Sequence, residues 1–263
     1  MKIFFLSGFP RAGNTLLASL LTQNPDIGGG VNGICMEAIK EIYLLKQHDV
    51  FLNYPNEKPL DNILDVIYPM YYKDFKCKYI LDRTPAGTEG NLRLLKKHVQ
   101  QSIKIIVLMR PLLEVLASFI KWAQKEPSSY LNHLTYVAEG GKGLVAQQCH
   151  WLMRPEGQLI KEINSFENLM KPENKHHALF IEFKDLIKKP KEVLQQIYKF
   201  FDIPYYPHRF KNLKQLPYDD TTLGGGLHTI HTGKITKHQT SVKKLLPPEI
   251  IQAYGHLKWK VIN

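Results

Sequence analysis

A short apolar run followed at once by a glycine-containing loop constrains this chain more than any other feature. Residues 3–6 (IFFL) predict a buried strand, residues 7–13 (SGFPRAG) a tight loop, and residues 14–17 (NTLL) the start of a helix. In the frame Gly8-x4-Gly13-x-Thr15, glycines let successive backbone N–H groups converge on an anion at the positive end of a helix. The sequence therefore predicts a phosphate-type anion site between the first strand and the first helix.

The loop departs from nucleoside triphosphatases at one position. Those proteins use a lysine to reach the β and γ phosphates, but here Asn14 holds that place and the cation comes earlier, at Arg11. An ordinary βα turn without a ligand is the alternative for the loop alone. A second site is needed to decide between them.

The length and composition of the chain indicate the class of protein. Its 263 residues, 44% hydrophobic and 22% charged, are typical of a globular protein, and no linker or repeat divides them, so we expect a single domain over residues 1–263. No apolar run approaches the ~20 residues of a membrane-spanning helix, and the N-terminal run is too short for a signal peptide. We therefore expect a cytoplasmic protein without a membrane partner.

Net charge and cysteine content indicate which kinds of ligand and partner this chain could bind. Lysine and arginine outnumber aspartate and glutamate by 35 to 24, which favours an anionic ligand such as a nucleotide, or an acidic acceptor. Because the surplus cations are scattered and no reader motif accompanies them, nucleic acid is disfavoured. The three cysteines are widely spaced and predict neither a disulfide framework nor a zinc site.

Alternating patterns predict the architecture. Further strands are expected at residues 78–81, 103–109 and 178–183, and helices at 15–23, 36–47, 60–71, 91–98, 112–124, within 126–175, and from 190 to 201. Gly28-Gly29-Gly30 is expected to form a turn, and residues 212–247 a long loop. Strands alternating with helices favour an α/β fold, a P-loop-like three-layer sandwich whose central parallel sheet carries helices on both faces and ligands at the carboxyl ends of its strands.

A second anion site is expected at the end of the clearest strand. The run 103–109 leads directly into Arg110, and Ser118 follows eight residues later. Arginine gives bidentate hydrogen bonds to phosphate oxygens, and a hydroxyl adds a donor. A P-loop kinase commonly has an aspartate at such a strand end to hold Mg²⁺, whereas an arginine would repel the metal. We therefore expect no metal site, and a kinase or nucleotide-binding protein with a degenerate loop is only the alternative.

The loop at 10–17 and the pair Arg110 and Ser118 resemble the sulfotransferases that use 3′-phosphoadenosine 5′-phosphosulfate (PAPS) and release 3′-phosphoadenosine 5′-phosphate (PAP). The resemblance implies that Arg110 and Ser118 hold the 3′-phosphate, and that Arg11 lies beside the bridging oxygen of the donor. It also implies a set of loop residues around the 5′-phosphosulfate: Gly8, Pro10, Arg11, Ala12, Gly13, Asn14, Thr15 and Leu16.

Weaker resemblances add further candidates. Asp82-Arg83-Thr84-Pro85 is similar to the Asp-Lys-(Thr/Asp)-Pro stretch of tyrosylprotein sulfotransferases, which would place Arg83 near the transferred sulfuryl group. In the family a late basic loop closes over the cofactor phosphates, and Lys234 and Lys237 are the candidates here. The Arg-Lys-Gly triplet of cytosolic sulfotransferases is absent.

The resemblance implies sulfuryl transfer to a hydroxyl or amine by in-line displacement, with a general base for the acceptor proton. The glutamate that tyrosylprotein enzymes carry after an (His/Asn)-Pro-Asp motif is missing, because residues 28–33 read GGGVNG. Glu37 and His228 are the candidate bases. The acceptor stays open between a small molecule, a glycan and a peptide, and so does the oligomeric state. Helices around 34–72 and 126–170 are expected to wall the acceptor cleft. Their aromatic residues could line such a site or fill an ordinary core; among them are Tyr43, Tyr68, Tyr71, Tyr72, Tyr130 and Trp151. A basic nucleotide- or nucleic-acid-binding module is the non-enzymatic alternative.

Overall fold

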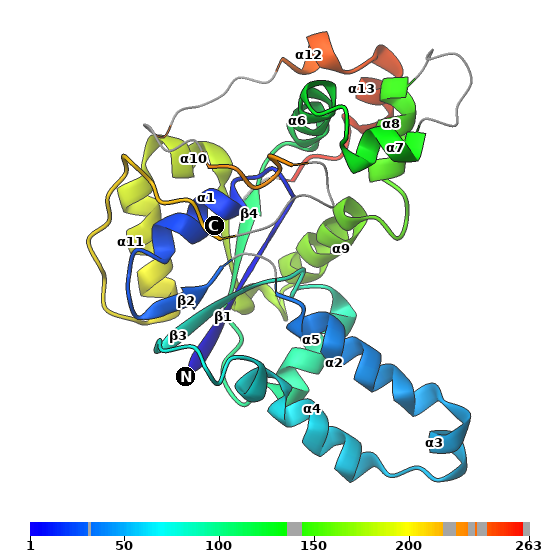
Figure 1. Cartoon of the computed structure of the whole chain (residues 1–263), viewed down its shortest axis with the longest axis vertical. Coiled ribbons are helices and arrows are strands. Elements are labelled where there is room, and N and C mark those ends of the chain that lie inside the picture. Colours follow the sequence, from blue (N-terminus) through cyan, green and yellow to red (C-terminus); the bar gives the residue numbers. More distant parts are fainter. Residues whose placement is uncertain (31–32, 136–143, 218–224, 231–234, 236–240, 260–263) are drawn as a thin grey trace.

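A computed structural model describes residues 1–30, 33–135, 144–217, 225–230, 235 and 241–259. One five-stranded sheet, all parallel, runs through it in the order β2-β3-β1-β4-β5 (Figure 1). The strands span Lys2–Gly8 (β1), Ile27–Gly29 (β2), Tyr79–Arg83 (β3), Ile105–Met109 (β4) and Ala178–Glu182 (β5). Because β3 and β4 both pair with β1, the residues that follow these three strands meet at one edge of the sheet.

The helices fill most of the segments between strands. In chain order they are α1 Asn14–Leu21, α2 Cys35–Leu44, α3 Asp49–Asn53, α4 Glu57–Tyr71, α5 Glu89–His98, α6 Leu112–Lys125, α7 Tyr130–Thr135, α8 Leu144–Leu152, α9 Gln158–Met170, α10 Phe183–Lys188, α11 Pro190–Phe201, α12 Val242–Leu245 and α13 Pro248–Tyr254. None of the described helices is both long and apolar enough to cross a membrane.

Both faces of the sheet are covered. Successive side chains of a strand point to opposite faces, and on β1 Phe4 stacks on Phe201 of α11 with ring centroids 3.8 Å apart, whereas Phe5 meets the ring of Tyr68 on α4 edge-on at 5.8 Å. Helices α1, α10 and α11 lie on the first side, and α2, α4, α5 and α9 on the second (Figure 1). The predicted three-layer sandwich is confirmed.

The edge strand β2 corrects one expectation. Gly28 and Gly29, expected in a turn, pair with β3 instead. A Cβ on Gly28 would lie 2.7 Å from Cys77 Sγ, and a Cβ on Gly29, whose φ is +82°, would lie 2.6 Å from the carbonyl oxygen of Leu81. The absence of side chains is therefore what allows the close approach. Glycine's low strand propensity hides this strand from local prediction.

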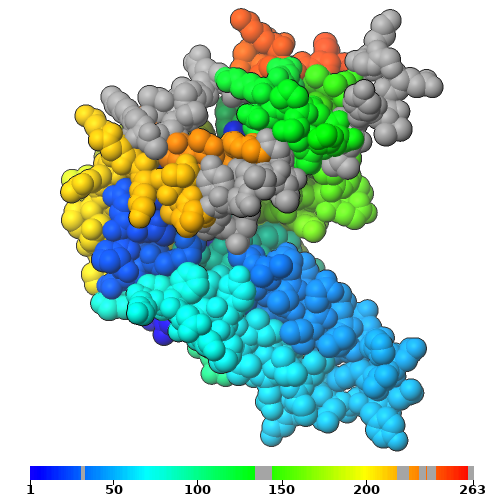
Figure 2. Space-filling model, viewed as in Figure 1, coloured from blue at the N-terminus to red at the C-terminus, as the bar shows by residue number. Residues whose placement is uncertain are grey.

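Two groups of helices extend beyond the sheet. Helices α2, α3 and α4 form an arm that projects to one side, and α6, α7, α8, α12 and α13 gather on the other (Figure 1). The outline of the molecule is hollowed between the arm and the region of α7 to α9 (Figure 2).

Candidate active site

The loop after β1, predicted to bind an anion, is tightly turned and leads into the N-terminus of α1. Three of its residues have positive φ, Gly8 at 141°, Arg11 at 67° and Gly13 at 93°. The first hydrogen bond of α1 runs from the N–H of Leu17 to the carbonyl of Gly13, at 2.9 Å. The amides of residues 13–16 therefore have no intrahelical acceptor, and they stand at the positive end of the helix.

Asn14 supports this loop from inside. Its side chain is 4% exposed, and its Nδ2 donates to the carbonyl oxygens of Gly8 at 3.1 Å and Phe9 at 2.9 Å. A lysine at this position could not make the same pair of short contacts with its ammonium at the end of four methylenes. The residue that departs from the triphosphatase pattern thus fixes the shape of the loop.

The two predicted anion sites are in direct contact. Arg11 Nε donates to Ser118 Oγ at 3.3 Å, and Arg11 Nη1 donates to the carbonyl oxygen of Leu227. Arg110, 8% exposed, donates from Nη1 to the carbonyl oxygen of Arg11 at 2.7 Å and from Nε to Glu114 at 3.3 Å. Burial lowers the pKa of the Arg110 guanidinium, and Glu114 opposes that shift. The loop, the end of β4 and the start of α6 therefore form one cationic cluster.

These groups open onto a cavity of about 1070 Å³. It is larger than the ~300–1,000 Å³ of most single-ligand pockets. Most of the predicted residues lie in its wall: Pro10, Arg11, Gly13, Asn14, Thr15, Leu16, Glu37, Arg83, Arg110, Ser118 and His228.

The remaining predicted residues lie elsewhere. Gly8 and Ala12 are behind the wall: Ala12 is fully buried, and a Cβ on Gly8 would lie 2.5 Å from the carbonyl oxygen of Leu108. Lys234 and Lys237 lie outside the described residues.

A buried glutamate that the sequence analysis missed lies against the loop. Glu162 of α9 is 2% exposed, and its Oε2 accepts from Ser7 Oγ at 2.7 Å and from the N–H of Gly8 at 3.1 Å. Burial raises the pKa of Glu162, and Ser7 and Arg83 oppose the shift. Burial lowers the pKa of Arg83 in turn, and the charge of Glu162 raises it. The available signal was an acid at a position of α9 flanked by the apolar stripe of Leu159, Ile163 and Phe166.

The two candidate bases both line the cavity. Glu37 lies in the first turn of α2, with its carboxylate 3.6 Å from Lys40 Nζ. His228 directly follows Leu227, and its carbonyl accepts from Gln215 Nε2 at 3.2 Å. Within the described ranges, no group of three or more His, Cys, Asp or Glu side chains is placed to hold a metal ion.

The aromatic wall comes from fewer elements than expected. Tyr130 and Trp151 line the cavity as predicted, and Trp122 joins them from α6. From residues 34–72, Glu37 belongs to the described lining but none of the tyrosines does. Tyr68 and Tyr72 instead pack into the core between the sheet and the arm. Arg154, which follows α8 and also lines the cavity, was missed.

Comparison with known proteins gives the family. The family model described as a sulfotransferase domain matches residues 2–244. Among solved structures, the chain is similar to a sulfotransferase domain from the curacin biosynthetic pathway, with 19% identity over 97% of each chain and a TM-score of 0.50. It is also similar to mouse sulfotransferase SULT7A1 complexed with PAP, with 14% identity over 97% of this chain and 82% of that chain and a TM-score of 0.55. No curated protein matches. The structural likeness bears on the fold alone, but the family model covers nearly the whole sequence, and the chain belongs to the sulfotransferase family of enzymes.

Proposed function

We propose that this protein transfers a sulfuryl group from PAPS to a hydroxyl or amine acceptor. The observation that carries the proposal is the contact between the two anion sites, in which Arg110 Nη1 donates to the carbonyl oxygen of Arg11 at 2.7 Å. A nucleotide with phosphates on both its 5′ and 3′ positions needs two such sites a ribose apart. The mouse structure complexed with PAP supports the choice of nucleotide.

Each residue has a definite task in this proposal. Arg110 and Ser118 would hold the 3′-phosphate, and the amides of residues 13–16 with the Thr15 hydroxyl would hold the 5′-phosphate. Arg11 would stabilise the charge that grows on the leaving oxygen, with Arg83 as a second clamp, because donors fixed in advance at a developing charge contribute most to such reactions. No step in this scheme relies on a metal.

When bound, the donor supplies the sulfuryl group: its bond from sulfur to the 5′-phosphate oxygen breaks as the acceptor oxygen or nitrogen bonds to sulfur, and the phosphate keeps the electron pair. The acceptor proton passes to a base within the cavity. Glu37 and His228 are the two candidates, and comparing turnover of Glu37→Gln and His228→Ala decides between them. Full activity in both variants would eliminate both residues.

The kinase alternative makes opposite predictions for nucleotide binding. Calorimetry on the whole chain with PAP, with AMP and with ATP plus Mg²⁺ separates the two. We expect PAP to bind without Mg²⁺ and AMP to bind at least about tenfold more weakly, because it lacks the phosphate that makes charge-assisted hydrogen bonds with Arg110. Tighter binding of Mg²⁺-ATP than of PAP would overturn the proposal.

A further inference from the structure

The cavity continues beyond the proposed donor site along one face of α6. Ser118, Lys121, Trp122 and Lys125 recur at intervals of three and four residues, so they share that face, and all four line the cavity. Ser118 ends the set of groups assigned to the nucleotide. The positions after it have no task in the proposed donor site.

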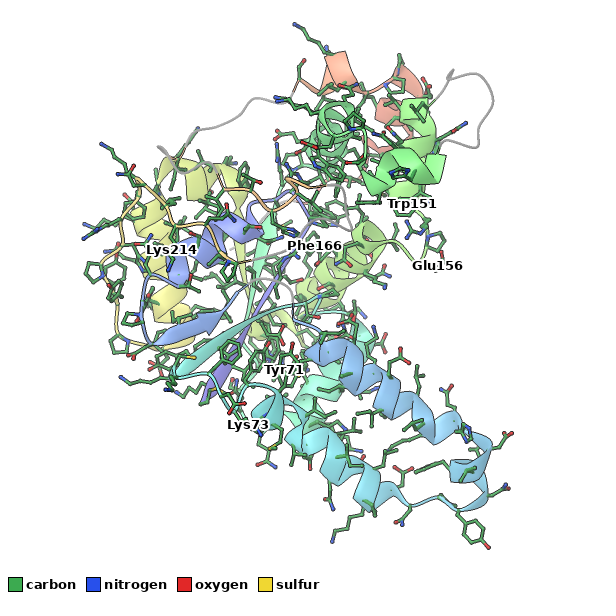
Figure 3. All side chains as sticks on the ribbon, viewed as in Figure 1. Tyr71, Lys73, Trp151, Glu156, Phe166 and Lys214 are labelled. Carbon is green, nitrogen blue, oxygen red and sulfur yellow. The ribbon has the colours of Figure 1, made fainter. Side chains whose placement is uncertain are left out.

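Three aromatic rings form the wall of this second region. The ring centroids of Trp122 and Tyr130 are 5.6 Å apart, and those of Tyr130 and Trp151 are also 5.6 Å apart. The indole N–H of Trp122 donates to the carbonyl of Gly225 at 2.9 Å, which fixes the first ring. Trp151 lies on α8, in the group of helices above the sheet (Figure 3). Such a row of rings suits a flat, cyclic ligand.

A guanidinium is fixed at the end of this row. Arg154 lies with its central carbon 3.5 Å from the ring centroid of Trp151, and its Nη1 donates to the carbonyl of the same residue at 3.0 Å. Because stacking and this hydrogen bond hold the planar fork in place, little side-chain freedom remains to be lost when it binds a carboxylate, sulfate or phosphate.

The charges of the region are unbalanced. Among the described residues, no carboxylate forms an ion pair with Lys121, Lys125 or Arg154. Glu126 is the acidic residue of the lining next to them. In the described lining, three cations thus lie beside one acid here, before the three arginines of the donor site (Arg11, Arg83 and Arg110) are counted.

Tyr130 connects this region to the proposed reaction centre. Burial raises the pKa of Tyr130 to about 12, and the charges of Arg154 and Arg11 both lower it. The phenol is therefore within electrostatic reach of the arginine at the end of the aromatic row and of the arginine beside the leaving group.

We infer that the acceptor is a cyclic hydroxyl compound with its own negative charge, its ring against Trp122, Tyr130 and Trp151 and its anionic group on Arg154. The inference rests on the proposed function, since it assigns the acceptor of the same reaction. The hydroxyl oxygen bonds to sulfur, the bond from sulfur to the 5′-phosphate breaks with its electron pair left on phosphate, and the hydroxyl proton goes to the base. Lys121 and Lys125 add attraction for the anion.

Two matched pairs of acceptors test this with radiolabelled PAPS. The sugar pair is p-nitrophenyl β-D-glucuronide and p-nitrophenyl β-D-glucoside, and the phenol pair is 4-hydroxybenzoate and 4-hydroxybenzamide. In at least one pair, we expect kcat/KM to be about tenfold or more higher for the anion, as one charge-assisted hydrogen bond provides. Which pair responds tells whether the ring is a sugar or a phenol.

Variants locate the effect. In Arg154→Gln, the ratio of kcat/KM for the charged acceptor to kcat/KM for its uncharged partner should fall toward one, mainly through a change in KM. The Kd for PAP should be unchanged. The control is Lys191→Gln, which removes an exposed cation on α11. Equal use of charged and uncharged members, no transfer to either anion, or an unchanged preference in Arg154→Gln overturns the inference. So does weaker PAP binding in Arg154→Gln, which would assign that arginine to the donor. Failure of the wild-type protein to bind PAP would instead overturn the proposed function.

Discussion

Arg110 donates a hydrogen bond from its Nη1 to the backbone carbonyl of Arg11, although 99 residues separate the two. The acceptor residue has a φ of 67°, a conformation that residues other than glycine rarely adopt. The residue after β4 thus helps to hold the loop after β1 in the conformation that we propose binds the 5′-phosphate. Arg110 therefore contributes both a positive charge and a constraint on the first anion site.

Arg11 should act mainly on the chemical step. Because its guanidinium is proposed to meet charge that grows only as the bond to sulfur breaks, Arg11→Ala should lower kcat by about 10²- to 10³-fold and change the Kd for PAP much less. Arg11→Lys should recover part of the rate. Steady-state kinetics with labelled PAPS measures this, and an unchanged kcat in Arg11→Ala would refute the role.

Asn14 should matter for stability. Asn14→Ala leaves the carbonyls of Gly8 and Phe9 without their buried donor, so we expect the free energy of unfolding to fall by about 2 kcal/mol. Asn14→Asp keeps the size and loses the donor, so it should be at least as unstable. Urea unfolding followed by circular dichroism is the measurement; a wild-type midpoint in both variants would contradict it.

Two substitutions of Glu162 distinguish the effect of its hydrogen bonds from the effect of its charge. Glu162→Ala removes the acceptor for Ser7 Oγ and the Gly8 N–H, which should cost about 3 kcal/mol of stability. Glu162→Gln keeps an oxygen for these donors and removes only the charge facing Arg83. We expect the second variant to stay nearly as stable as wild type with a lower kcat. Equal loss of stability in both would show that the charge itself holds the loop.

The burial of Asp82 should make the stability of the fold depend on pH. Asp82 is 1% exposed, and burial raises its pKa to about 6. Between about pH 4 and pH 6 the folded chain then keeps a proton that the unfolded chain has lost, so stability falls as pH rises through this window, by at most about 3 kcal/mol. Asp82→Asn removes this titrating group. The variant should therefore unfold at a higher urea concentration than wild type at pH 7.5, but not at pH 4. The same difference between the two proteins at both pH values would contradict this.

The parts of the fold that follow from local sequence could be predicted. Residues 105–109 are apolar throughout, as a strand buried on both faces requires, and β4 occupies this part of the run predicted at 103–109. That the loop after β1 and the residue after β4 meet at one edge of the sheet could be anticipated, because the carboxyl ends of parallel strands lie together. The eight-residue spacing of Arg110 and Ser118 was informative through its resemblance to the sulfotransferases.

The parts of the fold and of the site that depend on residues distant in the sequence could not be predicted. Glycine-rich β2 exists because β3 pairs with it, and no periodicity marks it. Glu162 is 155 residues from Ser7, and only its place on the apolar side of α9 hinted at burial. Arg154 stacks on the nearby Trp151, but only the fold brings this pair beside Tyr130 of a separate helix and into the wall of the cavity. These side chains are assembled by tertiary packing.

Binding of PAP tests the central claim most directly. Calorimetry without Mg²⁺ on wild type, Arg110→Ala and Arg110→Lys compares the nucleotide with AMP in each protein. We predict that PAP binds wild type with micromolar affinity, that Arg110→Ala abolishes the preference for PAP over AMP, and that Arg110→Lys restores part of it because the charge remains. An unaltered preference in Arg110→Ala, or no binding of PAP to wild type, would contradict the account.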